Sequence, residues 1–533
     1  MEMTKYTVPI GDSRTPTQFD IRDSESVNRM SGLKAYIGYT DTDIAGIEVD
    51  YENNTFTRLA GAIGKTAGAD FNTFPVYGGM RRCNLADDGT VNAYYGDNNY
   101  IEDGTNGQVM VEIPKFWYKV VPLKLQKQDW ADYGATAWVS AKSYAVGNIV
   151  TYNGSYYTCT TANSDAEFTA SKWHEITELG LEGYHILKAR YYISSVPKTG
   201  FKVHPLFVVN GEEIDHAYFS AYEGIAYDVS ESKYLLDDEQ VLNTTAGTGD
   251  KLSSIGGNYE RTITYYDKAT TSYKTADVNC GAKPISGLTS SNNLTRAGAR
   301  NIAANRGTGW YQQTVKATCA VWLLFIVEYG NCNIQNSIGA GVTGITDDST
   351  SNMASYIGST ASLGNATGIA TSTVDYSGTA QTSTATKKSV SYRGIENFYG
   401  NIWKWVDGVN IYGAYNNGGG KVYICDDMSF ADNKITDNYK FAGFTITQTS
   451  GYIKYFGWGS DEYDWLFMCS KIGGTSALPV GDYSYVTSSL NGHRVAYFGA
   501  AWHYGGNAGL YWTCHNGSSS RYRSISSRSL YLG

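Results

Sequence analysis

The stretch from Thr314 to Tyr329 limits the folds open to this chain more than any other segment. The residues at helical spacing along it are Val315, Cys319, Trp322, Phe325, Ile326 and Tyr329. Gly330 follows at the position where glycine commonly ends a helix. The longest apolar run, Cys319 to Val327, is too short to span a bilayer. The segment therefore predicts a helix whose apolar stripe faces a protein core and not a cofactor.

The composition around this helix is typical of a β-rich protein. The 533 residues include 59 glycines and 45 tyrosines but only 9 prolines, and charged residues make up 17%. Disorder would require fewer aromatic residues, and collagen would require a strict glycine period. A second helix is expected from Asn293 to Asn305, ending at Gly307. The predicted fold class is thus α+β and β-rich, with roughly two to four domains for a chain of this length.

Charge and cysteine spacing exclude several functions. A net charge of -9 argues against general nucleic-acid binding. The eight cysteines lie far apart, without CxxC or a Cys/His cluster, so we expect neither a metal site nor a cofactor. The N-terminus lacks a basic region followed by an apolar stretch, which predicts synthesis in a cytoplasm without membrane insertion. Any extracellular role would then depend on assembly into a particle.

Turn-rich β segments and shifts in composition divide the chain into predicted units. These are an N-terminal attachment or oligomerisation segment (1–58), a β-rich domain in two parts (59–130 and 179–279), a small inserted β module (131–178) and a C-terminal domain with two helices (280–533). Within the last unit, residues 337–390 are rich in Gly, Ser and Thr and are expected to form a loop.

The inserted module is dense in aromatic residues. Asn153-Gly154 lies between two short β runs and predicts a hairpin. Trp138 and Tyr152 are expected in the core of so small a domain. The candidates for carbohydrate binding are Tyr156, Tyr157 and Trp173. The alternative is that these three rings also belong to the core.

The segment from Arg494 to Gly533 contains no Lys, Glu, Gln, Met or Asp. It is rich in Tyr, Trp, Ser, Asn and Gly and carries four arginines and no acidic residue. Tyrosine and tryptophan supply rigid contact area, while Ser, Gly and Asn supply adaptable hydrogen bonds, as in antibody paratopes. The segment predicts a recognition surface, and its charge favours an anionic partner. The alternative is a β tail whose aromatic residues fill a core.

Two motifs resemble known families. Arg393 to Gly408, RGIENFYGNIWKWVDG, resembles the GN-x-W-x-W-x-DG signature of C-type-lectin-like domains of the formylglycine-generating-enzyme type. Gly499 to Tyr511 resembles the G-x-x-W-x-x-G-x-x-AG-L-F pattern of variable proteins diversified by retroelements. From about Phe71 onward, several segments resemble phage structural proteins, and residues 131–178 resemble the small chitin-binding type of carbohydrate module. The family usually closes near an IGFR-like strand, where this chain has Ile525 to Arg528, so its last strand is expected to lie elsewhere.

The resemblance implies a phage tail receptor-binding protein whose C-terminal lectin-like fold displays variable side chains. Diversification at adenine-containing codons does not produce Lys, Glu, Gln or Met, which fits their absence from the tail. The implied protein is a homotrimer in the virion that contacts other tail proteins and a host-cell receptor, either protein or glycan. The implied receptor contacts are Tyr497, His503, Tyr504, Asn507, Tyr511, Thr513, His515, Asn516, Arg521, Tyr522 and Arg523. The implied scaffold residues are Trp403, Trp405, Asp407, Trp502 and Gly509.

Three alternatives remain at this point. A formylglycine-generating enzyme needs a closely spaced cysteine pair near its C-terminus, whereas Cys514 stands alone and Cys469 lies far upstream. A glycosidase needs two carboxylates that flank the sugar. The acids that could supply them are Asp426, Asp427, Asp461, Glu462 and Asp464, and such loop acids are usually solvated. The third alternative is a structural tail or baseplate protein, which needs no receptor-binding or catalytic site. We therefore expect no catalytic activity.

Overall fold

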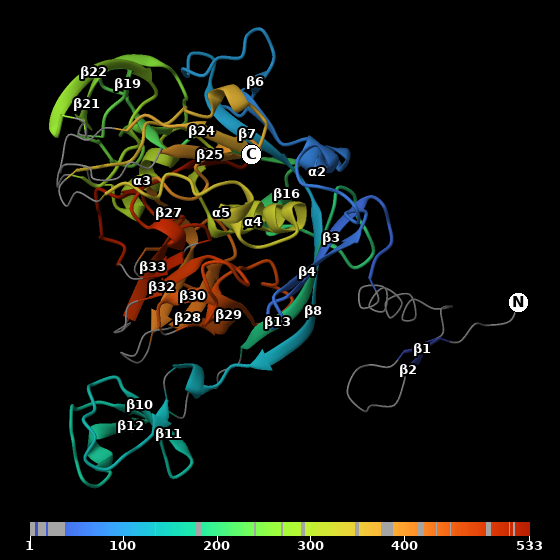
Figure 1. Ribbon diagram of the computed structural model, residues 1–533, viewed down its shortest axis with the longest axis vertical. Helices are drawn as coiled ribbons and strands as arrows, with labels where there is room; N and C mark the ends of the chain where they lie inside the picture. Colours follow the sequence, from blue (N-terminus) through green and yellow to red (C-terminus); the bar gives the residue numbers. More distant parts are fainter. Residues whose placement is uncertain are drawn as a thin grey trace, which may run out of the picture.

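The computed structural model describes residues 38–533 except 134, 177–182, 239–240, 268–269, 289–293, 347–350, 375–386, 414–419, 433, 448, 487–491, 511 and 515–516. Before residue 38 it describes two paired strands, β1 (Tyr6–Val8) and β2 (Thr17–Phe19). The predominance of strands over helices confirms a β-rich α+β fold (Figure 1). Among the described helices, none is both long and apolar enough to cross a bilayer.

The largest sheet has fourteen strands and takes them from both halves of the chain. The N-terminal half contributes β3 (Ile44–Asp50), β4 (Thr55–Ala60), β8 (Trp117–Lys127), β13 (Tyr184–Ser194) and β14 (Lys202–Val203). The C-terminal half contributes β27 (Trp403–Gly413), β28 (Gly420–Cys425), β29 (Tyr439–Ile446), β30 (Gly451–Trp458), β31 (Cys469–Ile472), β32 (Tyr483–Val486), β33 (Gly492–Phe498), β34 (Trp512–Cys514) and β35 (Ile525–Ser526). The segments on the two sides of residue 280 therefore pack into one body.

The last strand, β36 (Ser529–Tyr531), joins a second sheet of six strands. The others are β5 (Arg81–Leu85), β6 (Val91–Tyr94), β7 (Gln108–Pro114), β17 (His216–Ser220) and β23 (Trp310–Gln312). Smaller sheets comprise β15 (Val208–Val209) with β16 (Glu212–Glu213), β18 (Ile225–Asp228) with β19 (Lys233–Leu235) and β20 (Lys251–Ser253), β21 (Tyr259–Asp267) with β22 (Ser272–Cys280), and β24 (Gly368–Thr371) with β25 (Lys388–Tyr392) and β26 (Ile395–Glu396).

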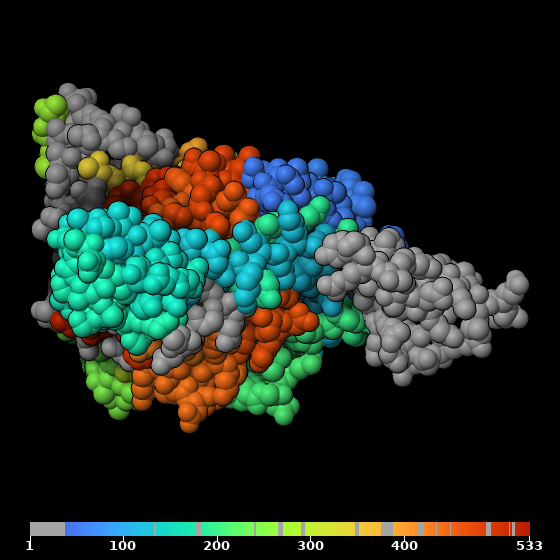
Figure 2. All heavy atoms as spheres, turned by 90° about the horizontal axis from the view of Figure 1, so that it is seen from below, coloured from blue at the N-terminus to red at the C-terminus, as the bar shows by residue number. Residues whose placement is uncertain are grey.

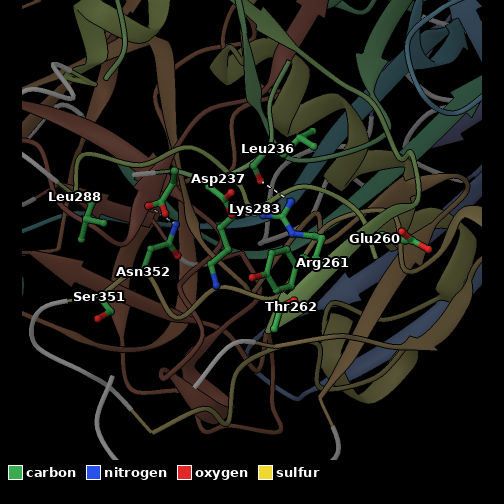
Figure 3. Close-up of a pocket in the computed structure, with 11 residues that line it drawn as sticks. Leu236, Asp237, Glu260, Arg261, Thr262, Lys283, Leu288, Ser351 and Asn352 are labelled. Atoms are coloured by element: carbon green, nitrogen blue, oxygen red, sulfur yellow. Dashed lines mark hydrogen bonds and ion pairs between the residues drawn. The ribbon is translucent and has the colours of Figure 1, made fainter. Parts of the chain in front are cut away.

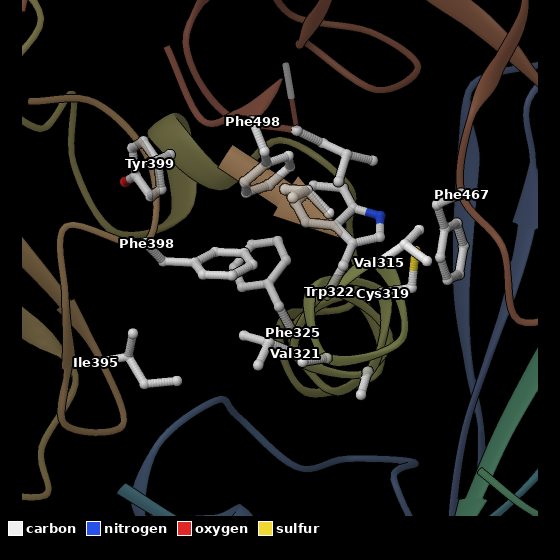
Figure 4. Packing of buried hydrophobic residues seen from close by; sticks show 14 of the residues in the cluster. Val315, Cys319, Val321, Trp322, Phe325, Ile395, Phe398, Tyr399, Phe467 and Phe498 are labelled. Carbon is white, nitrogen blue, oxygen red and sulfur yellow. The ribbon is translucent and has the colours of Figure 1, made fainter. Parts of the chain in front are cut away.

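Helix α4 (Val315–Tyr329) lies in the centre of the body, and α3 (Arg296–Ala304) packs nearby. The other α-helices in the described part of the chain are short: α2 (Pro75–Gly78) and α5 (Ile334–Ser337). Thr314 caps α4 by accepting a hydrogen bond from the Ala317 amide, and Gly330 ends it with a φ of 68°. Figure 4 shows the Trp322 and Phe325 rings of α4 directed at aromatic side chains from other segments. The helix is buried around nearly its whole circumference, so its packing exceeds the single stripe that the sequence predicts.

His204 provides a pH-dependent contribution to the stability of this body. Burial lowers its pKa from 6.5 to about 3, with Lys316 and Lys202 acting in the same direction. The ring lies 5.1 Å from the ring of Phe116, and its Nδ1 accepts the Leu206 amide hydrogen. In the unfolded chain the His204 imidazole takes up a proton as the pH falls below about 6.5, whereas in the folded protein it does so only near pH 3. The free energy of unfolding therefore falls as the pH is lowered through this window.

We therefore expect the His204→Asn variant to lose less stability in acid than the wild type. Asparagine retains an acceptor for the Leu206 amide but does not titrate. Between pH 7 and pH 4 the wild type should lose about 3 kcal/mol more unfolding free energy than the variant. Urea denaturation at both pH values measures this difference, and equal losses would show that His204 is not the titrating group.

Candidate functional site

The inserted module is a four-stranded sheet outside the main body. Its strands are β9 (Thr136–Ala137), β10 (Ile149–Tyr152), β11 (Ser155–Cys159) and β12 (Trp173–Glu175), in the order β12-β11-β10-β9. Asn153 and Gly154 have φ values of 49° and 84° and form the predicted hairpin turn between Tyr152 and Ser155. The module follows β8 and precedes β13, which pair with each other at Lys127 and Tyr184. It therefore extends from the end of a strand pair as a separate lobe (Figure 1), and seen from below it lies in front of the body as a compact group of residues (Figure 2).

A short neck fixes the lobe to the body. Gln128 is buried and exchanges two hydrogen bonds with the backbone of Thr445, at 2.8 and 3.1 Å. Asp132 contacts His185 Nε2 at 2.8 Å and Lys471 Nζ at 2.6 Å. Burial opposes ionisation of Asp132, but the hydrogen bonds from His185 and Lys471 outweigh it and lower the pKa of this carboxyl below its usual range. The neck is thus held by a charged contact that persists at neutral pH.

The two faces of the module sheet have different surroundings because side chains alternate along each strand. On one face, Ile149 and Ile176 pack with Trp130 of the neck and with Tyr156, whose ring lies 5.8 Å from the Trp130 ring. The other face contains Val150, Cys159 and the buried Trp173. Only this second face is turned away from the neck cluster.

Four half-buried aromatic rings cover the second face, and we call them the aromatic platform. They are Trp138, Tyr152, Tyr157 and Phe168. Phe168 is central: Tyr152 stacks on it at 4.0 Å with an interplanar angle of 8°, and Trp173 lies 5.3 Å away within the core. Trp138 meets Tyr152 edge-on at 5.6 Å. The tryptophan and the two tyrosines combine a flat apolar face with a polar tip, which suits contact with a partly apolar, hydroxyl-bearing ligand.

The structure changes several of the module predictions. Trp173 is 7% exposed and belongs to the core beneath Phe168, so it does not offer a free face. Tyr156 is half-buried on the neck side, and Tyr157 is half-buried on the platform side. Trp138 and Tyr152, expected in the core, are half-buried at its edge. Phe168 was not predicted, because no periodic pattern surrounds it in the loop before β12.

Residues of the predicted C-terminal recognition surface meet around Trp502. Its indole is fully buried, the Arg523 guanidinium lies 5.8 Å from its ring, and the His503 ring lies 5.7 Å away. Tyr504 follows, packing edge-on against Trp403 at 5.1 Å. Arg521 and Tyr522 are exposed, with Tyr522 at 47%. Arg523, His503 and Tyr504 thus place aromatic and cationic groups next to the buried Trp502 and Trp403, and the exposed Arg521 and Tyr522 precede Arg523 in the chain.

Two implied receptor contacts lie in the core instead. Tyr497 is 7% exposed and packs edge-on against Trp403 and Trp405, at 5.0 and 5.4 Å. Thr513 is 3% exposed and sits in β34 between β32 and β33. Both residues belong to central strands whose two faces are covered by other segments. Although side chains alternate between the faces, neither face is exposed to solvent. The prediction for Tyr511, His515 and Asn516 falls outside the described residues.

Asn507 and Arg528 of the C-terminal segment both make hydrogen bonds within the protein. The Asn507 carboxamide oxygen accepts a hydrogen bond of 2.8 Å from the Tyr452 hydroxyl, and the residue is half-buried. Arg528 is fully buried and donates to backbone oxygens of Ser220 and Asn397 at 3.2 and 2.9 Å. Burial lowers the pKa of Arg528 to about 10, although Glu223 and Glu396 oppose this. One of the four tail arginines is therefore structural and adds no surface charge.

The five implied scaffold residues are all buried. Asp407 accepts hydrogen bonds from Arg300 at 2.6 and 2.8 Å and from Gln312 at 2.6 Å. The Arg296 guanidinium lies 3.6 Å from the same carboxylate. Gly509 has a φ of 129°, and a Cβ there would come within 1.9 Å of an Asp482 oxygen. The Asp407 carboxylate, in β27, connects this strand to Arg300 of α3 and Gln312 of β23. These contacts fix the base of the C-terminal surface.

Within the described part of the chain, no group of three or more His, Cys, Asp or Glu residues has a geometry suited to a metal ion. Burial raises the pKa of the Cys469 thiol to about 12, so this thiol stays protonated at neutral pH. Asp464, one of the loop acids considered for glycosidase chemistry, is 6% exposed and pairs with Lys202 at 2.8 Å. Its contacts are those of a structural carboxylate.

Comparison with protein families assigns one part of the chain. Carbohydrate-binding module family 5/12 matches residues 137–173. The matched segment contains the whole aromatic platform and the hairpin of the lobe. A search of curated proteins found no match. The chain thus contains a segment similar to a carbohydrate-binding module, which is consistent with a binding protein.

Proposed function

We propose that this protein is an adhesin that binds carbohydrate through the aromatic platform of its inserted module. The observation that carries the proposal is the coincidence of the family match with the platform, which lies on the face of the lobe opposite its neck. A neck held by Asp132 and Gln128 keeps the lobe attached to the body while its platform faces outward. The polymer that this type of module suggests is chitin, a β-linked chain of N-acetylglucosamine.

We further propose that the whole chain is a phage tail receptor-binding protein with a C-type-lectin-like C-terminal region. The resemblance of residues 393–408 and 499–511 to such proteins supports this proposal. The burial of the signature residues Trp403 and Trp502, beside exposed Arg521 and Tyr522, also supports it. In a homotrimer, three copies of each surface would add avidity to individually weak contacts. The protein would act in the virion, together with other tail proteins and a host-cell receptor.

The same proposal assigns no catalytic activity to the chain. The buried, protonated Cys469 thiol and the Lys202-paired Asp464 carboxylate are structural groups. A structural tail or baseplate protein remains the competing proposal. It differs by predicting that substitutions on the C-terminal surface leave cell binding unchanged.

Replacing Arg521 and Tyr522 together with alanine should reduce binding of the fluorescently labelled protein to receptor-bearing bacteria by at least about thirtyfold. Exposed tyrosine and arginine side chains commonly supply most of the energy at an interface, about 2 kcal/mol or more at a hot spot. Flow cytometry on a strain that the wild type labels measures this effect. Tyr273→Ala, which removes an exposed tyrosine of the β21–β22 hairpin, is the matched control. Unchanged labelling by the double variant would favour the structural protein.

A further inference from the structure

A polar cavity of about 460 Å³ lies between the base of the β21–β22 hairpin and residues 351–356 (Figure 3). Its lining includes Asp237, Glu260, Arg261, Lys283 and Asn352. The volume falls within the range of small-molecule sites in proteins. The cavity is remote in sequence from the module and contains none of the C-terminal residues implied as receptor contacts.

The floor of the cavity is held in place by a buried hydrogen-bond network. The Asp238 carboxylate is 4% exposed and accepts hydrogen bonds from Ser286 at 2.6 Å and from Asn352 at 2.8 Å. The Asn352 amide also donates to the Pro284 carbonyl at 3.0 Å, and its oxygen accepts the Ala354 amide hydrogen at 2.9 Å. A floor with fixed donors and acceptors is preorganised for a polar ligand.

Cationic and aromatic side chains form the wall nearest the hairpin. Tyr356 is 4% exposed, and its ring lies 4.9 Å from the Arg261 guanidinium and 4.8 Å from the Lys283 ammonium. Arg261 donates to the Leu236 carbonyl at 3.1 Å and pairs with Asp237. These contacts hold the guanidinium at the cavity edge in one orientation.

The mixture of charges indicates which ligand the cavity suits. Three carboxylates, Asp237, Asp238 and Glu260, stand with two cations, Arg261 and Lys283, so neither a free anion nor a free cation matches the lining. A hydroxyl group both donates and accepts hydrogen bonds and can satisfy both kinds of partner. Apolar atoms from Leu236 and Leu288 also line the cavity and can contact the carbon-bound hydrogens of a sugar ring.

We propose that this cavity is a second saccharide site that takes a neutral sugar residue. It rests on the proposed adhesin function and extends it to a site on the body of the molecule. Gly287, next to the lining residue Leu288, donates its amide hydrogen to the Tyr522 carbonyl at 3.0 Å. The segment that contributes Leu288 to the cavity therefore contacts the backbone of the C-terminal segment at Tyr522.

Saturation-transfer NMR on the full chain tests the proposal. The probes are the methyl glycosides of glucose, galactose, mannose and N-acetylglucosamine, with inorganic phosphate as a competing anion. Ser351→Trp fills the cavity with an indole from a half-buried lining residue. Asp237→Asn removes the charge of an exposed lining carboxylate. Trp138→Ala removes part of the module platform, and Glu231→Gln changes an exposed carboxylate outside the cavity.

At least one glycoside should bind the wild type, Trp138→Ala and Glu231→Gln with the same affinity. Its affinity should fall about tenfold or more in Asp237→Asn, as expected for the loss of a hydrogen bond to a charged group. It should fall by at least as much in Ser351→Trp, because the indole occupies the cavity. Loss in Trp138→Ala alone would place binding in the module and overturn the second site. Binding to no glycoside, or competition by phosphate, would also overturn it. Binding of insoluble polysaccharide by the module is measured separately, so failure of the two proposals is distinguishable.

Discussion

Replacing Asp407 with alanine should lower the free energy of unfolding by about 3–5 kcal/mol, the range for removal of one partner from a buried ion pair. The Asp407 side chain is fully buried, and Arg300 and Gln312 both donate hydrogen bonds to it. Without the carboxylate, Arg300 retains its contact with Asp432 at 2.9 Å, but Arg296 loses its closest buried counter-charge. Two guanidinium groups between the α3 helix and strand β27 would then share one partly exposed counter-charge, Asp432, which lies 3.6 Å from Arg296.

Urea denaturation followed by far-UV circular dichroism measures the effect. Asp215→Asn is the matched control because it breaks an ion pair with Lys115 at a carboxylate that is 80% exposed. Exposed pairs of this kind contribute about 1 kcal/mol or less. A loss in Asp407→Ala no larger than that in the control would contradict the assignment of Asp407 as the central scaffold residue.

Replacing Trp138 and Tyr152 together with alanine should weaken adsorption to chitin about a hundredfold. Both rings are half-buried at the edge of the platform, and truncation of a buried aromatic contact commonly costs about 2 kcal/mol or more of binding energy. Phe168 and Trp173 remain in the double variant, so the inner part of the core persists. Depletion of protein from solution by insoluble chitin measures the change.

Tyr156→Ala is the control for this experiment because Tyr156 lies on the opposite face, against Trp130. It removes an aromatic ring from the same strand pair without altering the platform. Near-UV circular dichroism of each variant monitors folding of the lobe. Equal adsorption by the double variant and the control would show that the platform is not the binding surface.

Local signals in the sequence predicted the elements that depend on local chemistry. The α4 helix has its expected cap at Thr314 and its expected end at Gly330, and Asn153-Gly154 forms the expected turn. The Asn293–Asn305 helix is present as α3, Arg296–Ala304, with Thr295 as its cap. In each case, residues close in sequence determine the conformation.

The sequence could not predict which face of a strand is covered by distant segments. Tyr156 and Tyr157 are neighbours, but the neck residue Trp130 covers only the first. Tyr497 and Thr513 belong to a segment whose composition predicts a recognition surface, but they are buried in strands at the centre of a sheet. The cavity beside Arg261 is likewise assembled from segments far apart along the chain, with no motif in any of them.

The adsorption isotherm of the full-length protein on insoluble chitin, with cellulose and an uncharged agarose matrix in parallel, tests the central claim most directly. The account predicts saturable adsorption to a polysaccharide, strongest on chitin, that soluble N-acetylglucosamine oligomers reverse. Adsorption to none of the three matrices, or equal adsorption that these oligomers do not reverse, would contradict it.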